Sequence, residues 1–152
     1  MDKEYLDWHK IDEAVWTLAD VILKEYKPDL LIGISRGGLA PSVRFSHITG
    51  LPLRVMGFKF YKSIGETQEK PEITIPLTEN IENKKILVID DVADTGETLA
   101  EVKKYLEEKN PAEVRVAVIA KKPTSIFDPD YYIMFTDKWI VFPWEKMPVT
   151  KK

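Results

Sequence analysis

Two turns, each directly after an apolar run, carry the polar residues with the clearest capacity for chemistry. The first run, residues 29–35, ends in Ser-Arg-Gly-Gly, and the second, residues 85–90, leads into Asp-Asp-Val-Ala-Asp-Thr-Gly-Glu-Thr at 90–98. Carboxylates, a guanidinium and backbone amides beside glycine are groups that bind hydroxyls, metal ions and phosphates. Both turns are therefore candidate parts of an anion-binding site.

The adjacent acids Asp90 and Asp91 suggest a cation or a diol as their partner. Neighbouring carboxylates repel, so they are favoured where a cation or hydroxyl groups occupy the space beside them. The chain has no cysteine and only His9 and His47 as imidazoles, which favours oxygen ligands and magnesium or calcium rather than zinc. A ribose diol together with magnesium would meet this need.

Residues 94–98 have the composition of a phosphate cradle at a helix N-terminus. The free backbone N–H groups and the positive dipole end favour a phosphate there, with the Thr95 and Thr98 hydroxyls as further donors. Gly96 would let the backbone approach the anion closely. A capping box, with Asp94 as N-cap and Glu97 three residues on, is the plain structural alternative and is compatible with phosphate binding.

The spacing of apolar residues predicts alternating helices and strands around these turns. Helices are expected at 11–26, about 41–48 and 95–109, strands at 29–35, 53–60, 85–90, 113–120 and 131–135, and a short ribbon strand at 73–77. Residues 61–72 are polar and predict a mobile excursion, whereas 138–147 are rich in aromatics. The alternation predicts an α/β fold with a doubly wound, mostly parallel sheet, whose ligands bind at the carboxyl ends of the strands.

Composition limits the classes of protein to which the chain can belong. Its 152 residues fit one domain, and 44% apolar with 31% charged residues is the balance of a soluble protein. The net charge of −3 and the short basic clusters do not predict nucleic-acid binding. The apolar runs are too short to cross a bilayer and the N-terminus is polar, so we expect a cytoplasmic protein without stable membrane insertion. Abundant Lys and Glu with a single Gln favour a thermophilic source.

The segment ILVIDDVADTGETL, residues 86–99, resembles the phosphoribosyl-pyrophosphate signature of the type I phosphoribosyltransferases. The resemblance implies that Asp90 and Asp91 hold the ribose hydroxyls and Mg²⁺, with Asp91 as the metal ligand. It also implies that Asp94 exchanges a proton with the imidazole nitrogen of a purine. The remaining donor-binding residues that it implies are Val92, Ala93, Asp94, Thr95, Gly96, Glu97 and Thr98.

The Ser-Arg-Gly-Gly turn resembles the pyrophosphate loop of bacterial xanthine-guanine phosphoribosyltransferases. From the residues alone, it could equally be an ordinary strand-to-helix turn with a surface arginine. The resemblance implies that Ser35, Arg36 and Gly37 hold the pyrophosphate. In some members of the family the peptide corresponding to Ser35–Arg36 is cis, which the sequence does not reveal.

Two further stretches resemble the base-binding end of the same enzymes. A solvated strand exit would explain Lys121 and Lys122, and hydrophobic packing would explain the aromatic residues near the C-terminus. The resemblance implies instead that Lys122 contacts the purine 6-oxo group, Trp139 stacks on the ring and the Ile140 backbone reads position 2. Lys121 competes with Lys122 for the first role because the lysine is doubled.

The resemblance spans nearly the whole chain and implies an enzyme of purine salvage. It would convert a 6-oxopurine (xanthine, guanine or hypoxanthine) and phosphoribosyl pyrophosphate into the nucleoside monophosphate and pyrophosphate, as a homodimer or homotetramer. The single domain would comprise residues 1–152, with a core at about 10–136 and a small hood from 1–9 and 137–152. The alternatives are a phosphoribosyltransferase for another base and a non-catalytic regulator that senses phosphoribosyl pyrophosphate.

Overall fold

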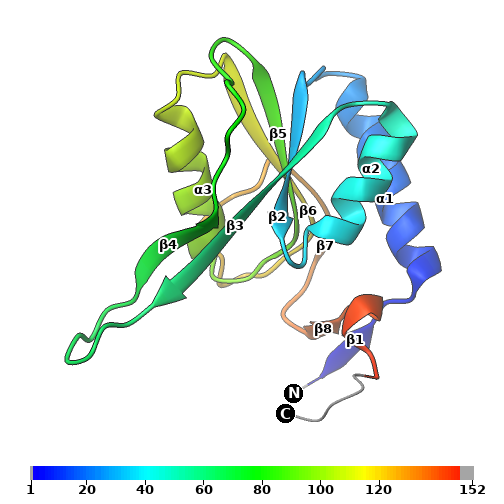
Figure 1. Ribbon diagram of the computed structural model, residues 1–152. Coiled ribbons are helices and arrows are strands. Elements are labelled where there is room, and N and C mark those ends of the chain that lie inside the picture. The colour runs from blue at the N-terminus through cyan, green and yellow to red at the C-terminus, as the bar shows by residue number, and fades with distance from the viewer. Residues whose placement is uncertain (1, 148–152) are drawn as a thin grey trace.

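The structure is a computed structural model that describes residues 2–147 (Figure 1). Met1 and residues 148–152, which the sequence analysis assigned to the hood, lie outside the described residues. The helices are α1 (Trp8–Leu23), α2 (Leu39–Thr49), α3 (Glu97–Glu107) and the 3₁₀ turn η1 (Pro143–Glu145). The strands are β1 (Lys3–Tyr5), β2 (Leu30–Ser35), β3 (Leu53–Tyr61), β4 (Lys70–Ile75), β5 (Lys85–Ala93), β6 (Glu113–Lys121), β7 (Tyr131–Phe135) and β8 (Trp139–Val141).

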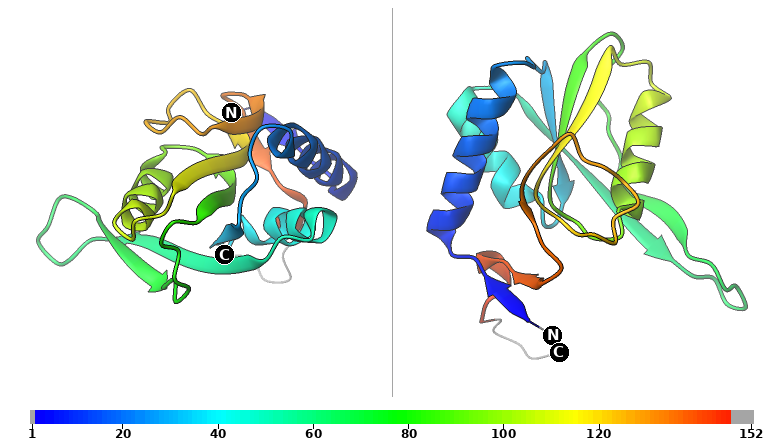
Figure 2. Two further views of the ribbon diagram at one scale, coloured as in Figure 1. Left: turned by 90° about the horizontal axis from the view of Figure 1, so that it is seen from above. Right: turned by 180° about the vertical axis from the view of Figure 1, so that it is seen from behind.

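Six strands form one central sheet in the order β4-β3-β2-β5-β6-β7. All neighbouring pairs are parallel except β3 and β4, which form an antiparallel hairpin. Helices α1 and α2 cover one face of the sheet and α3 covers the other (Figure 2). The predicted doubly wound, mostly parallel α/β fold is therefore confirmed.

Helix α1 shows how the apolar spacing positions an element. Its buried residues recur every three or four positions, as predicted, and pack on the sheet. The helix begins at Trp8, three residues earlier than predicted, because the Asp7 carboxylate accepts from the Lys10 amide at 2.8 Å and caps the first turn. It ends at Leu23 rather than Tyr26, but Tyr26 stays buried and its hydroxyl donates to the Ile86 carbonyl at 2.8 Å.

The two ends of the described chain form a second, smaller sheet. Strands β1 and β8 pair in parallel, and the Leu6 amide donates to the Val141 carbonyl at 3.0 Å. Leu6, Ile140 and Phe142 are buried in the same apolar cluster as α1. The hood, formed by β1, β8 and η1, lies at one end of the central unit (Figure 1), and its buried apolar residues pack into the cluster that contains α1.

The β3–β4 hairpin is longer than the sequence predicted. Strand β4 begins at Lys70 rather than 73, so the predicted excursion 61–72 shortens to a connection at 62–69. Its first residues, Lys70, Pro71 and Glu72, are exposed, and two of them are charged. The strand lacks the alternating pattern there, which explains why the sequence did not reveal it.

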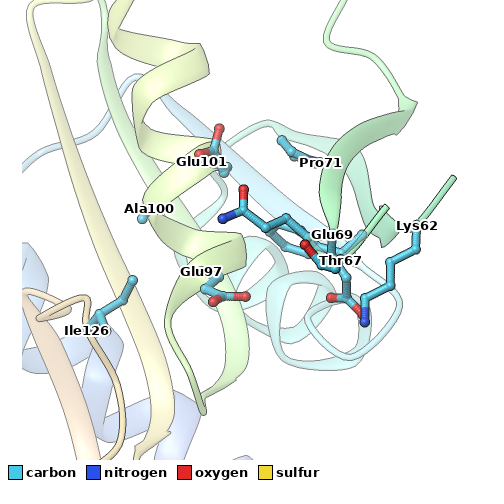
Figure 3. A pocket seen from close by; sticks show the side chains of 10 residues that line it. Lys62, Thr67, Glu69, Pro71, Glu97, Ala100, Glu101 and Ile126 are labelled. Carbon is cyan, nitrogen blue, oxygen red and sulfur yellow. The ribbon is translucent and has the colours of Figure 1, made fainter. Parts of the chain in front are cut away.

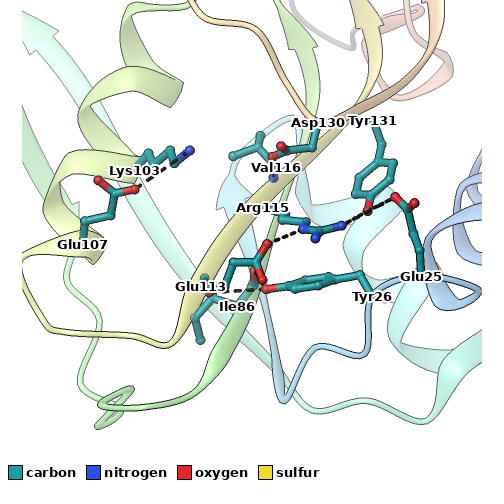
Figure 4. Close-up of polar contacts among 10 residues, drawn as sticks. All are labelled: Glu25, Tyr26, Ile86, Lys103, Glu107, Glu113, Arg115, Val116, Asp130 and Tyr131. Carbon is teal, nitrogen blue, oxygen red and sulfur yellow. Dashed lines mark hydrogen bonds and ion pairs between the residues drawn. The ribbon is translucent and has the colours of Figure 1, made fainter.

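A polar network at the amino end of β6 links the segment that follows α1 to β6 and β7 (Figure 4). The Arg115 guanidinium donates to Glu113 at 2.5 Å and to the Tyr131 hydroxyl at 2.7 Å, and it lies 4.4 Å from the centre of the Tyr26 ring. Tyr131 in turn donates to Glu25 at 2.6 Å. These polar groups form hydrogen bonds with one another at the amino edge of the sheet, opposite the strand ends that carry the two turns. Their place indicates a structural role. Within residues 2–147, no helix has the length and apolar character needed to cross a membrane.

Candidate active site

The topology places both predicted turns at one crevice. From β2 the chain passes through α2 to β3 on one side, whereas from β5 it passes through α3 to β6 on the other. Since β2 and β5 are parallel neighbours, this is the topological switch point, where doubly wound sheets bind ligands beyond the strand ends. The sheet thus brings the Ser-Arg-Gly-Gly turn and the acidic pair together.

Close packing between the two turns requires glycine at two positions. A Cβ at Gly37 would overlap the Asp91 carboxylate, and one at Gly38 would collide with the Ile34 and Ile89 carbonyls. Arg36 is exposed, and the Ser35–Arg36 peptide is cis. The turn therefore presents its backbone and the exposed Arg36 side chain beside an acidic group.

The acidic pair lies inside the last part of β5, because this strand runs to Ala93, three residues beyond its predicted end. Asp90 is buried and accepts from the Asp91 amide at 2.8 Å, and Asp91 accepts from the Val92 amide at 2.7 Å. Burial, and then the negative charge of Asp91, raise the pKa of Asp90 well above its ordinary value. Burial likewise raises the pKa of Asp91. A buried acid beside a half-buried one is suited to a cation or to hydroxyl donors.

Asp90 and Asp91 are better suited to Mg²⁺ than to a metal ion whose ligands all come from the protein. Their donors are carboxylate oxygens, the ligands that Mg²⁺ prefers, and the described residues include no cluster of three acids or histidines around one point. Mg²⁺ commonly takes one or two carboxylates and completes its shell with water and substrate phosphates. Asp90 and Asp91 can therefore hold magnesium together with a phosphorylated ligand.

Residues 94–98, the predicted phosphate cradle, do not form the capping box that was the structural alternative. Helix α3 begins at Glu97, two residues later than predicted, and its N-cap is Gly96, with no side-chain cap. Asp94 and Thr95 lie before the helix and are exposed, so Asp94 is not the N-cap. The structural alternative of an Asp94–Glu97 capping box is therefore excluded, because Gly96, in the left-handed conformation, is the N-cap.

Gly96 has a conformational and a packing role. Its φ of 82° is one that side-chain-bearing residues rarely adopt, and a Cβ there would press on the Ser125 hydroxyl and the Phe127 amide. The sequence analysis had assigned this glycine to the close approach of an anion. The structure adds a second reason for glycine here, a close neighbour within the chain, the 124–127 segment.

That segment also sets the orientation of the cradle. The Thr124 hydroxyl donates to the Asp94 carbonyl at 3.0 Å, and the Ile126 amide donates to the Thr95 carbonyl at 2.8 Å. Because the C=O and N–H of a trans peptide point in opposite directions, the amides that follow these carbonyls point away from the 124–127 segment. The sequence analysis missed this support because no motif links it to residues 94–98.

A cavity of about 110 Å³ lies between the carboxyl end of the sheet and the hood. It brings together all four predicted base-binding residues with part of the acidic strand end. Its lining residues are Asp91, Val92, Asp94, Lys122, Trp139, Ile140, Phe142 and Glu145. The sequence analysis missed Phe142 and Glu145, because their place depends on how the hood packs.

The structure distinguishes Lys122 from Lys121 as the candidate for contact with the base. Lys122 is buried, lines the cavity, and has its ammonium 5.6 Å from the centre of the Trp139 ring. Lys121 does not line the cavity, and its ammonium pairs with Asp128 at 2.8 Å. Only Lys122 is therefore placed to reach a ligand in this cavity.

The aromatic residues of the C-terminal segment divide into two groups. Trp144 stacks on Phe142, with ring centres 4.8 Å apart, and contacts Trp8 at 5.9 Å, as expected of packing. Trp139 keeps 48% of its surface exposed and lines the cavity. Trp139 thus has free ring surface for a planar ligand.

A larger cavity of about 550 Å³ lies under the β3–β4 hairpin (Figure 3). Lys62, Thr67 and Glu69 of the hairpin face Glu97 and Glu101 of α3 across it. It shares Glu97 with the cradle but includes neither the acidic pair nor Lys122. We therefore take the smaller cavity as the candidate base site and the larger one as the space beneath a hairpin beside the phosphate cradle.

The switch-point crevice, the acidic pair and the cradle are the features of a type I phosphoribosyltransferase fold. The chain belongs to the phosphoribosyl transferase domain family, whose model matches residues 1–147. The purine phosphoribosyltransferase of Pyrococcus horikoshii is 48% identical in sequence, with a TM-score of 0.89 over 100% of this chain and 99% of that one.

Two curated relatives are more distant in sequence. The xanthine-guanine phosphoribosyltransferase of Idiomarina loihiensis is 30% identical over 145 residues, covering 93% of this chain and 86% of its own. The hypoxanthine-guanine phosphoribosyltransferase of Dictyostelium discoideum is 30% identical over 131 residues, covering 80% of this chain and 73% of its own. These proteins share the family and differ in the bases that their names record.

Proposed function

We propose that the protein transfers ribose 5-phosphate from phosphoribosyl pyrophosphate to a 6-oxopurine, releasing pyrophosphate, as a step of purine salvage. The observation that carries the proposal is the cavity of about 110 Å³. It places a buried lysine, a half-exposed tryptophan and the acid Asp94 beside the acidic pair of β5. The purine enzymes among its relatives support the choice of base.

The donor would lie along the carboxyl edge of the sheet. Asp90 and Asp91 bind the ribose hydroxyls, and Asp91 binds Mg²⁺. The amides and hydroxyls of residues 94–98 hold the 5-phosphate, while the turn at 35–37 holds the pyrophosphate with its backbone and the Arg36 guanidinium. Bound Mg²⁺ supplies electrostatic neutralisation of the diphosphate.

The base would occupy the cavity between sheet and hood. Lys122 donates to the 6-oxo group, Trp139 stacks on the ring, and the Ile140 backbone contacts position 2. Asp94 accepts the proton that the imidazole nitrogen loses when that nitrogen bonds to the sugar carbon. A general base in such a position contributes about 10²–10⁴-fold to the rate.

The transition state would have positive charge on the ribose and negative charge on the leaving pyrophosphate. The chain would act mainly by orienting the base against the sugar carbon and by placing Arg36 and backbone amides at the departing oxygens. The 62–69 connection beside the cradle is the segment that would exclude water during transfer. We further propose a homodimer or homotetramer acting in the cytoplasm.

A pyrophosphate-release assay with a panel of bases tests the function. With donor and Mg²⁺, we expect turnover with at least one of hypoxanthine, guanine and xanthine, and far less with adenine, uracil or orotate. Asp94→Asn serves as the matched control: it should bind the donor normally and lose about 10²–10⁴-fold in turnover. Donor binding without turnover on any base would favour a phosphoribosyl-pyrophosphate sensor, and turnover only on adenine or a pyrimidine would favour another base.

A further inference from the structure

The segment 122–126, which follows β6, continues the hydrogen bonding between β5 and β6 beyond the end of the strands. Three successive carbonyls, those of residues 93–95, each accept one hydrogen bond from it. The donors are, in order, the Lys122 amide at 2.9 Å, the Thr124 hydroxyl at 3.0 Å and the Ile126 amide at 2.8 Å. The first residues of the phosphate cradle are therefore held from one side by a ladder of three bonds.

The middle bond of this ladder is the one that depends on the type of side chain. Backbone amides make the first and third bonds, and every residue except proline carries such an amide. The middle donor is a hydroxyl, and the residue before it, Pro123, has no amide to offer. A substitution at Thr124 can therefore remove this bond and leave the rest of the ladder in place.

The middle bond fixes the direction of the peptide between Asp94 and Thr95. This peptide is trans, so its N–H points opposite to its C=O and away from the segment that follows β6. The Ile126 bond orients the Gly96 amide in the same sense. Within residues 2–147, neither the Thr95 amide nor the Gly96 amide donates to another group of the protein. Two oriented amides without a protein acceptor are donors available to a phosphate.

We propose that Thr124 is a positioning residue for the 5-phosphate, because its hydroxyl keeps the Thr95 amide directed at that group. This inference rests on the proposed function and deepens it. Thr124 bonds to the carbonyl that faces away from the phosphate, so it acts through the main chain and not by contact with the ligand. Without the hydroxyl, the peptide before Thr95 gains freedom to turn. Binding must then restrict it, which lowers the affinity for the phosphate.

The test measures the Kd of two ligands that each carry one part of the donor's phosphate chemistry. Inosine 5′-monophosphate has the 5-phosphate, whereas pyrophosphate with Mg²⁺ has only the diphosphate. Thr124→Val removes the hydroxyl and keeps the shape of the side chain. By calorimetric titration, we expect a Kd for the nucleotide about three- to tenfold higher, the effect of one hydrogen bond, and a Kd for pyrophosphate within about twofold of wild type.

Two further variants separate positioning from a general effect on structure. Thr124→Ser keeps a hydroxyl and should restore most of the affinity for the nucleotide. Thr49→Val is the matched control, because the Thr49 hydroxyl also donates to a backbone carbonyl, that of Phe45 at 2.8 Å. It lies in the last turn of α2, at the end opposite the Ser-Arg-Gly-Gly turn, and its loss should leave both Kd values unchanged. Thr124 is exposed, so we expect its variants to fold.

The results that would overturn the inference are measured by binding alone. One is a Thr124→Val protein that binds the nucleotide as tightly as wild type, and another is an equal loss of affinity for both ligands. A serine variant as weak as the valine variant would also overturn it. Wild type that binds both ligands but forms no nucleotide from the donor would contradict the proposed transfer and leave the role of Thr124 intact. Wild type without affinity for the nucleotide would contradict both.

Discussion

At the scale of single residues, the paired lysines offer a sharp test of the base site. Lys122 is buried in the cavity, whereas the Lys121 ammonium lies outside it with Asp128. Lys122→Gln should raise the KM for the base by about 10–100-fold, because a charge-assisted hydrogen bond to the 6-oxo group is lost. Initial-rate kinetics at saturating donor measure this effect.

Lys121→Gln is the control, since it removes the same charge one residue away. It should change the KM for the base by less than about threefold, as expected for an exposed ion pair. The reverse pattern, with Lys121→Gln the more damaging, would exclude the arrangement of the cavity described above.

The buried acid Asp90 should lower stability when the site is empty of cations. Its folded-state pKa is raised above the ordinary 3.8, so folding favours the protonated form. The contribution of the Asp90 carboxyl to stability is present below pH 3.8 and is lost as the pH rises through the folded-state pKa. Asp90→Asn should therefore melt about 2–4 °C higher than wild type at neutral pH in a chelating buffer.

Calorimetric melting over a pH series checks the sign of this effect. The advantage of Asp90→Asn should shrink as the pH falls toward 3.8, where the wild-type carboxyl is protonated in both states. A variant that is less stable than wild type at neutral pH would show that the Asp90 charge stabilises the fold.

At the scale of elements, the β3–β4 hairpin is the part best placed to move over the donor. Its 62–69 connection is exposed, lies beside the first turns of α3, and shares a cavity with Glu97 of the cradle (Figure 3). We expect hydrogen exchange of amides 62–69 to slow at least severalfold with donor, Mg²⁺ and product base bound. Unchanged exchange across this segment would argue against closure.

The hood has a separable role, because it supplies Trp139 and Ile140 of the proposed base site and none of residues 94–98. Leu6 packs with Ile140 and Phe142, so Leu6→Ala should cost about 2–5 kcal/mol of stability and loosen the wall of the cavity. We expect the KM for the base to rise about tenfold while the donor Kd stays within about twofold. Calorimetric titration with the donor and kinetics with the base measure the two effects.

Leu106→Ala is the matched control for that variant. Leu106 is equally buried, but it belongs to the opposite apolar cluster, under the last turn of α3. It should lower the melting temperature by a similar amount without a change in the KM for the base. Equal effects of both variants on that KM would mean that the hood acts through global stability alone.

At the scale of the whole molecule, the parts that the sequence predicted are those encoded locally. A continuous apolar run marks a strand covered on both faces, so β2 and β5 were recognisable, and the polar turns that follow them indicated the site. Helical periodicity likewise marked α1 and α3. The convergence of the two turns followed from the rule that parallel strands share a carboxyl edge.

The parts that the sequence did not reveal depend on contacts between distant segments. Gly96 is the N-cap because the 124–127 segment packs against it, and Glu145 reaches the cavity because β8 pairs with β1. Neither contact leaves a periodic signal in the chain. The polar start of β4 was missed for a similar reason, since its pairing with β3 defines it as a strand.

The most direct test of the account is detection of the nucleotide product by mass spectrometry. The protein is mixed with phosphoribosyl pyrophosphate, Mg²⁺ and hypoxanthine, with the Asp94→Asn variant in parallel. We predict one nucleoside monophosphate formed for each donor consumed in wild type, and donor binding with greatly slowed product formation in the variant. Donor binding by wild type with no nucleotide formed from hypoxanthine, guanine or xanthine would contradict the central claim.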